Sequence, residues 1–176
     1  MTLYLYEITT DATAAQEVGQ LLKALDAEIV RGGGELIEAQ VTAQHRRLFA
    51  IAEFDSTAAD LDVTELGTAS VTGPHPVRLV GADLAELKAV RPQAGYLVEW
   101  DLPADLDMDS YLARKKANAP RYADVPEVRF LRTYVREDMD KCLCFYDAPD
   151  EAAVRRARDA VSTPIDRLYG LDGQVQ

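Results

Sequence analysis

The strongest constraint on the fold is an internal repeat, because the middle of the chain recurs near its end. The segment Arg78-Leu79-Val80-Gly81-Ala82-Asp83 returns as Arg167-Leu168-Tyr169-Gly170-Leu171-Asp172, at an offset of 89 residues. Near the start of each half, Tyr4-Leu5-Tyr6-Glu7 returns as Tyr96-Leu97-Val98-Glu99, at an offset of 92 residues. Self-similarity of this kind indicates one supersecondary unit written twice. We therefore expect both halves to share one order of elements.

Hydrophobic spacing predicts that order in the first half. Alternating residues predict strands over 3–8, 36–41, 48–54 and 77–80. Apolar residues three and four positions apart predict a helix from Ala14 to Ile29, and a weaker helix is predicted over 57–66. The segment Gly73-Pro74-His75-Pro76 is expected to form the turn before the last strand.

The second half repeats the pattern. Strands are predicted over 96–100, 128–135, 142–146 and 167–169, with a helix over 108–118. A second helix is expected to be capped by Asp147 and to bury Val154, Ala157 and Val161. The resulting order, β-α-β-β-α-β, is that of the ferredoxin-like unit.

The predicted organisation is a first repeat over 1–81, a linker over 82–93, a second repeat over 94–170 and a loose tail over 171–176. A ferredoxin-like sheet carries helices on one face only, and an apolar bare face must be covered. We therefore expect an α+β protein whose two tandem ferredoxin-like repeats form a pseudo-dimeric α/β barrel or sandwich within one chain. The space between the sheets is then the natural ligand cavity.

Composition restricts the partners. The net charge of −11 argues against nucleic acid and anionic membrane surfaces as partners. No apolar run of about 18 residues is present, and the N-terminus has no basic region typical of a signal peptide. The two cysteines, Cys142 and Cys144, are poorly spaced for a mutual disulfide. We expect a soluble cytoplasmic protein with reduced thiols.

Several segments of the second half carry a family resemblance. The specific one is Cys144-x-Tyr146-x-Ala148-Pro149-Asp150-Glu151, supported by Tyr96-Leu97-Val98-Glu99, Thr133-Tyr134-Val135 and Thr163-Pro164-Ile165-Asp166-Arg167. Over about 96–169 the chain resembles a family of small bacterial ferredoxin-like proteins that includes nickel-binding members. The resemblance implies a ferredoxin-like fold, homo-oligomers formed through sheets, and a small-ligand or metal role without an established reaction. In the first half, Ala52 is assigned to the position of Cys144, and Phe54 to that of Tyr146.

Nickel prefers imidazole ligands, and this chain has only His45 and His75, both outside the segments that carry the resemblance. We therefore expect no bound metal, and no other cofactor motif is present.

Glu99 and its counterpart Glu7 are the first candidate functional groups, since each interrupts an apolar strand. Such a carboxylate is either a ligand-binding or acid/base group, or part of a structural ion pair with an arginine such as Arg129 or Arg132. Cys144 is either a reactive thiolate or a small buried hydrophobe.

Aromatic residues on three strands could line a cavity or simply fill a sheet interface. The run Arg114-Lys115-Lys116 is expected to be the solvated face of a helix, with anion binding as the alternative. The aromatic set comprises Tyr96, Trp100, Tyr134 and Tyr146.

Four functions remain open, and no catalytic set is identified. The leading hypothesis is a small-ligand-binding or sensor-like protein with a cavity between the repeats. The alternatives are a cofactor-free enzyme of the dimeric α/β barrel type (a mono-oxygenase or isomerase), a nickel-binding protein, and a structural oligomerisation module. The candidate ligand-binding residues are Glu99, Trp100, Arg132, Tyr134, Cys144 and Tyr146.

Overall fold

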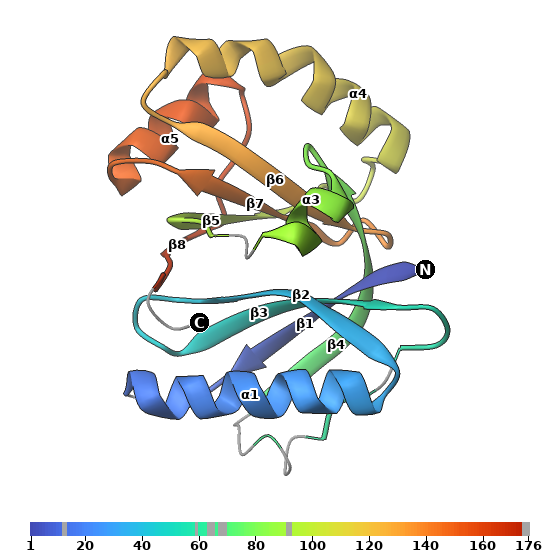
Figure 1. The fold of residues 1–176 in the computed structure, drawn as a ribbon. Helices are drawn as coiled ribbons and strands as arrows, with labels where there is room; N and C mark the ends of the chain where they lie inside the picture. The colour runs from blue at the N-terminus through green and yellow to red at the C-terminus, as the bar shows by residue number, and fades with distance from the viewer. Residues whose placement is uncertain (12–13, 59, 63–65, 67–69, 91–92, 174–176) are drawn as a thin grey trace. The chain divides into compact units, whose positions relative to one another are not determined.

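The computed structural model describes residues 1–11, 14–58, 60–62, 66, 70–90 and 93–173, and the fold is α+β (Figure 1). The chain forms two compact units. The first comprises Met1–Val77, Leu84–Gln93 and Leu171–Gln176, and the second comprises Arg78–Asp83 and Ala94–Gly170. The domain organisation expected from the sequence, with repeats over 1–81 and 94–170, stays a prediction.

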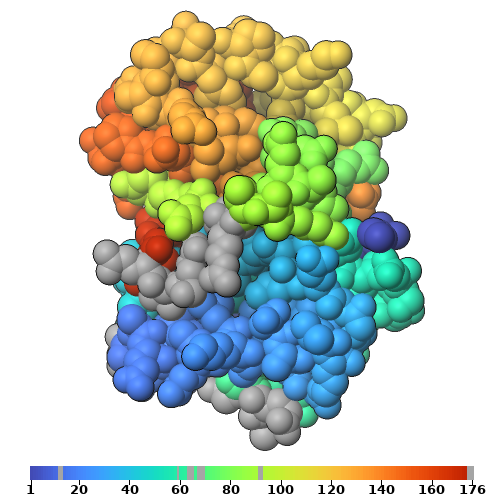
Figure 2. All heavy atoms as spheres, viewed as in Figure 1, coloured from blue at the N-terminus to red at the C-terminus, as the bar shows by residue number. Residues whose placement is uncertain are grey.

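The first unit is an antiparallel sheet with the strand order β2-β3-β1-β4. Helix α1 runs along one face of this sheet (Figure 1). The side of α1 that faces away from the sheet is part of the surface drawn in blue in Figure 2. The apolar stripe of α1 packs on Tyr6, Leu48 and Ala50 of that face. The elements are β1 (Thr2–Thr9), α1 (Ala15–Arg31), β2 (Gly34–Val41), β3 (Arg47–Phe54), β4 (Ser70–Val80) and α3 (Leu84–Ala89).

The second unit has the strand order β6-β7-β5-β8, so each unit orders its strands second, third, first, fourth. Asp107 and Asp150 cap the two longer helices by accepting hydrogen bonds from the backbone N–H groups of Ser110 and Ala153. The elements are β5 (Tyr96–Asp101), α4 (Met108–Asn118), the 3-10 helix η1 (Ala119–Asp124), β6 (Arg129–Arg136), β7 (Lys141–Asp147), α5 (Glu151–Ala160) and β8 (Arg167–Gly170).

Alternation along β5 and β7 gives the second sheet two different faces. Val98 lies opposite Cys144, and Trp100 lies opposite Cys142. These four side chains pack with residues of α4 and α5, so they lie on the helix-facing side. Glu99 points to the other side, because neighbouring residues of a strand alternate.

Four sequence-based predictions of local structure are wrong. Residues Gly73–Pro76 lie within β4, which pairs with β1 through a register shift between Leu5 and Glu7, and do not form a turn before the strand. Asp150, not Asp147, caps α5. Residue 171 forms a bridge with Thr42, and the N–H of residue 172 donates to the Val41 carbonyl at 2.8 Å, so these two residues are not loose.

The weaker helix predicted over 57–66 is the fourth case. Residues 57, 58 and 60–62 are not helical, Leu66 is, and the rest of that prediction lies outside the described residues. Among the helices of the described ranges, none is both long enough and apolar enough to cross a bilayer.

Candidate functional site

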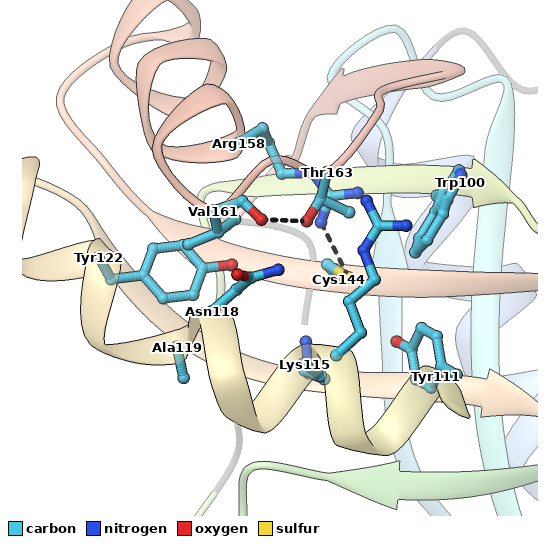
Figure 3. A pocket seen from close by; sticks show the side chains of 11 residues that line it. Trp100, Tyr111, Lys115, Asn118, Ala119, Tyr122, Cys144, Arg158, Val161 and Thr163 are labelled. Carbon is cyan, nitrogen blue, oxygen red and sulfur yellow. Dashed lines mark hydrogen bonds between the residues drawn. The ribbon is translucent and has the colours of Figure 1, made fainter. Parts of the chain in front are cut away.

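A small pocket lies in the second unit between α4, the end of α5 and the helix-facing side of the sheet (Figure 3). Its volume of about 30 Å³ accommodates one or two water-sized groups. Arg114 and Ala119 are exposed, so the pocket reaches the surface beside α4. The lining residues are Trp100, Tyr111, Arg114, Lys115, Asn118, Ala119, Tyr122, Cys144, Arg158, Val161 and Thr163.

Arg158 is the most unusual group of the pocket, because it is charged and only 2% exposed. Its Nη1 donates to the Tyr146 hydroxyl at 3.1 Å and to Cys144 Sγ at 3.4 Å, and its Nη2 donates to the Pro164 carbonyl at 2.6 Å. Its buried Nε has no hydrogen-bond partner in the described ranges. None of its contacts there is a carboxylate, although a buried guanidinium is costly without an opposite charge.

Helical spacing explains why Arg158 is buried, and it is also the signal that sequence reasoning missed. Arg158 lies four residues after Val154 and three before Val161, both of which were expected on the buried side of the helix. A residue at that spacing belongs to the same stripe. A charged residue inside an apolar helix stripe is the same kind of signal as the glutamate inside the apolar strand β5.

Two further cations stand around the pocket, and both come from α4. Lys115 Nζ lies 4.2 Å from the centre of the Phe130 ring, and Arg114 Cζ lies 5.3 Å from that of Trp100. Arg114 and Lys116 are exposed, as expected for a solvated helix face, whereas Lys115 is half-buried; Arg114 and Lys115 both line the pocket. The described lining residues include no aspartate or glutamate, so the pocket is electropositive.

Cys144 lines the pocket from β7, and its sulfur accepts a hydrogen bond from Arg158 (Figure 3). The Thr133 hydroxyl donates to its sulfur at 3.1 Å, and the Cys142 sulfur lies 4.0 Å away. The hydrogen bond with Cys142 and the charges of Lys115 and Arg158 hold the pKa of the Cys144 thiol well below its usual value, against the opposing effect of burial. The same bond and burial raise the pKa of Cys142. The Cys144 thiol therefore ionises more readily than an ordinary cysteine and has a cationic partner in Arg158.

Two tyrosines complete the polar side of the pocket. The hydroxyls of Tyr122 and Tyr146 lie 2.7 Å apart, and burial raises the pKa of Tyr122 to about 12. Burial also raises the pKa of Tyr146. Both phenols thus stay protonated near neutral pH and remain able to donate hydrogen bonds.

Glu99 lies on the opposite side of the sheet, in a closed ion-pair network. Its oxygens accept hydrogen bonds from Lys141 Nζ at 2.7 Å and Arg167 Nε at 2.6 Å, and its side chain is fully buried. Burial alone would raise the pKa of Glu99, but Lys141 and Arg167 bring it below its ordinary value. Its ion-pair partners are therefore Lys141 and Arg167, not Arg129 or Arg132 as suggested by the sequence.

The six sequence-predicted residues divide equally between the two faces. Trp100, Cys144 and Tyr146 lie on the helix-facing side, and Cys144 and Trp100 line the pocket. Arg132 and Tyr134 lie with Glu99 on the other side, where both contact the Phe145 ring. The predicted aromatic set therefore does not line one cavity, because Tyr134 faces away from Trp100 and Tyr146. Tyr111, Tyr122 and Arg158 were missed, whereas Lys115 belongs to the run for which anion binding was the alternative.

Both histidines belong to the first unit, where His45 Nε2 lies 2.5 Å from the Asp172 carboxylate. Across the described residues, no three His, Cys, Asp or Glu side chains converge as a metal site would require.

Comparison with known proteins confirms the resemblance seen in the second half. Residues 96–170 match the model of a family described as nickel responsive protein SCO4226-like, which covers less than half of the chain. No curated protein matches the chain.

One solved structure supports the fold over nearly the whole length. A candidate chlorite dismutase, TA0507, is similar over 99% of this chain and 97% of its own, with a TM-score of 0.56 and 14% identity. A microcompartment protein from Desulfitobacterium hafniense DCB aligns over 98% of this chain and 96% of its own at 11% identity, with a TM-score of only 0.30. At such identities the first match indicates a shared ferredoxin-like α+β fold and nothing about activity.

Proposed function

We propose that this protein binds a small oxyanion in the pocket of its second unit. The observation that carries the proposal is Arg158, a buried cation whose Nε is unpartnered among the described residues and which has no carboxylate partner there. Lys115 and Arg114 add positive charge around the same space. An anion there would gain charge-assisted hydrogen bonds from groups already in place.

The size of the pocket limits the ligand. About 30 Å³ is far below the several hundred that enclose a drug-sized molecule. We therefore propose that one or two oxygens of bicarbonate, phosphate or a similar anionic group enter the pocket, while the rest of the ion or molecule stays at the surface beside Arg114. The planar guanidinium of Arg158 would orient two oxygens, whereas Lys115 would act as a point charge.

The sensor-like role and the cavity between two fused repeats, both expected from the sequence, stay predictions, as do the duplication, the barrel or sandwich and the homo-oligomer. The oxyanion proposal does not depend on them, because every lining residue of the pocket belongs to the second unit.

Nickel binding does not suit the pocket. The described lining residues offer one thiol and three cations, and the matched segment contains no histidine. A divalent cation would face Arg158 and Lys115 with little opposite charge. We therefore expect nickel not to remain stoichiometrically bound after dialysis. About one nickel per chain, lost on replacing His45 or Cys144, would contradict this expectation.

The alternative of a cofactor-free enzyme that uses Glu99 as a base also loses support. A general base works best with a pKa near the working pH, whereas the pKa of Glu99 lies below its ordinary value. Its two oxygens are already engaged by Lys141 and Arg167.

The oxyanion proposal is tested by calorimetric titration of phosphate and bicarbonate in low-chloride buffer. Arg158→Gln should weaken binding by about tenfold or more, which corresponds to about 1.4 kcal/mol. Arg155→Gln is the matched control, because Arg155 is an exposed residue of the same helix. Absence of binding to the unmodified protein, or equal binding by Arg158→Gln, would contradict the proposal.

A second pair of variants covers the case in which Arg158→Gln fails to fold. Lys115→Gln removes a half-buried pocket cation, and Lys116→Gln removes its exposed neighbour. Weaker binding should follow the first substitution only.

A further inference from the structure

We infer that Cys144 is a modification site, a thiolate beside Arg158 that hydroperoxides oxidise to a sulfenic acid. This inference goes beyond oxyanion binding and does not require it. Two independent observations support it. Cys144 lines a pocket that reaches the surface, and the buried guanidinium of Arg158, whose Nε has no partner within the described chain, donates to the Cys144 sulfur through Nη1.

Charge balance explains why the sulfur would be anionic. Arg158 needs an opposite charge in its buried position. Among the described residues, Cys144 is the only side chain it contacts that can become anionic near neutral pH, since its other contacts are a phenol and a backbone carbonyl. Thr133 donates a further hydrogen bond to the same sulfur. Lys115 and Arg114 also line the pocket, so one thiolate leaves it electropositive.

The size and polarity of the pocket favour a small uncharged oxidant. Hydrogen peroxide has two heavy atoms, which suits a space of about 30 Å³. The Cys144 thiolate attacks one peroxide oxygen, the O–O bond breaks, and hydroxide leaves and takes a proton from solvent to become water. Sulfur loses two electrons, the peroxide gains them, and the product is Cys–SOH. Arg158 stays protonated and is a positioning residue that stabilises the thiolate.

Cys142 provides an internal control for this inference. It lies 4.0 Å from Cys144 on the same strand but does not line the pocket, and both sulfurs are buried. Cys142→Ser leaves Cys144 as the only thiol and keeps a hydroxyl donor beside it. Cys144→Ser leaves only Cys142.

The test treats both folded variants with hydrogen peroxide and traps sulfenic acid with dimedone, read by mass spectrometry. Cys142→Ser should acquire one adduct per chain, whereas Cys144→Ser should stay unlabelled until it is unfolded. In the otherwise unaltered chain, peptide mapping should place the adduct on Cys144, and Arg158→Gln should slow labelling about tenfold or more while Arg155→Gln does not.

Labelling of Cys144→Ser at the same rate, or labelling of Cys144 only after unfolding, would overturn the inference. If a variant does not fold, the peptide map of the unaltered chain decides. Failure of the oxyanion proposal stays distinguishable, because phosphate titration of Cys144→Ser measures anion binding without the thiol.

Discussion

The helix-facing side of the sheet is lined by an apolar core in the first unit, whereas in the second unit it carries polar and charged groups. In the first unit, α1 packs its apolar stripe on Ile8, Leu48 and Ala50. In the second, the same side holds two thiols, the Tyr146 hydroxyl and the guanidinium of Arg158. Both units have the same strand order, so the topology alone does not produce the charged pocket. Its origin lies in a few side chains of β7, α4 and α5.

Strand register sharpens this comparison and corrects the sequence-based assignment. When β1 and β5 are aligned through Tyr4 and Tyr96, Tyr6 aligns with Val98. Tyr6 lies opposite Ala50, and Val98 lies opposite Cys144. Ala50, rather than Ala52, therefore holds the position of Cys144. An alanine there adds to an apolar core, whereas a cysteine beside an arginine forms a charged pair.

The aligned glutamates should give the largest difference between the units. Glu99→Gln should lower the free energy of unfolding by about 3–5 kcal/mol, because it leaves buried Lys141 without its full opposite charge. Glu7→Gln should cost about 1 kcal/mol or less, since its pair with Arg47 is longer, at 3.5 Å, and Arg47 is partly exposed. Urea denaturation measures both. Equal losses would mean that the two glutamates play the same structural role.

The contribution of Glu99 should also depend on pH. Its pKa is lowered in the folded state, so its stabilising effect is present above its ordinary value of 4.5 and is lost as the pH falls through the lower folded value. The difference in stability between the unaltered chain and Glu99→Gln should therefore shrink in acid. A difference that does not change with pH would contradict this assignment.

Removal of a single hydroxyl should also distinguish the units. Tyr146→Phe takes one hydrogen-bond acceptor from buried Arg158 and one partner from Tyr122, so it should cost about 1–3 kcal/mol. Tyr4→Phe is the control in the first unit, because the Tyr4 hydroxyl makes no hydrogen bond within the described part of the chain. Thermal melting of both variants measures the effect, and a neutral Tyr146→Phe would show that this network adds little stability.

Helix capping should give the smallest difference. Asp150→Ala should cost about 1 kcal/mol, since it removes the acceptor of the Ala153 N–H. At the start of α1 stands Ala14, which has no side-chain acceptor, so Ala14→Ser should stabilise the protein by about 0.5–1 kcal/mol. Chemical denaturation checks both directions. A loss of stability in Ala14→Ser would show that another contact at that position matters more.

Local patterns in the sequence predict most of the second unit. The helix over 108–118 has the predicted bounds, and the four predicted strands are each recovered within one residue at each end. The apolar residues of these elements are clearly spaced, and this spacing predicts whether each segment is a helix or a strand. The strand around Pro74 was missed because its glycine and prolines are typical of a turn. A β-bulge in the pairing with β1 allows these prolines to lie within a strand, and no local pattern in the sequence predicts it.

The candidate site was only partly predictable. Alternation along β7 places Cys142 and Cys144 on one face, but it does not identify which helix residue faces them. Arg158 comes from α5, and its contact with Cys144 depends on how that helix packs on the sheet. The ion-pair partners of Glu99 likewise come from β7 and β8. No local sequence pattern predicts that these two strands pair with β5.

The most direct test of the central claim is the ionisation of Cys144 in the folded protein. The ultraviolet absorbance of the thiolate is followed against pH in Cys142→Ser, with Cys144→Ser as the control. Arg158, Lys115 and Arg114 face this sulfur or line its pocket, together with Tyr111 and Tyr122. We predict a midpoint for Cys142→Ser below the ordinary thiol value of about 8.5, and a midpoint for Cys144→Ser above it. A midpoint at or above that value for Cys142→Ser would contradict the account of a charged pocket built around Cys144 and Arg158.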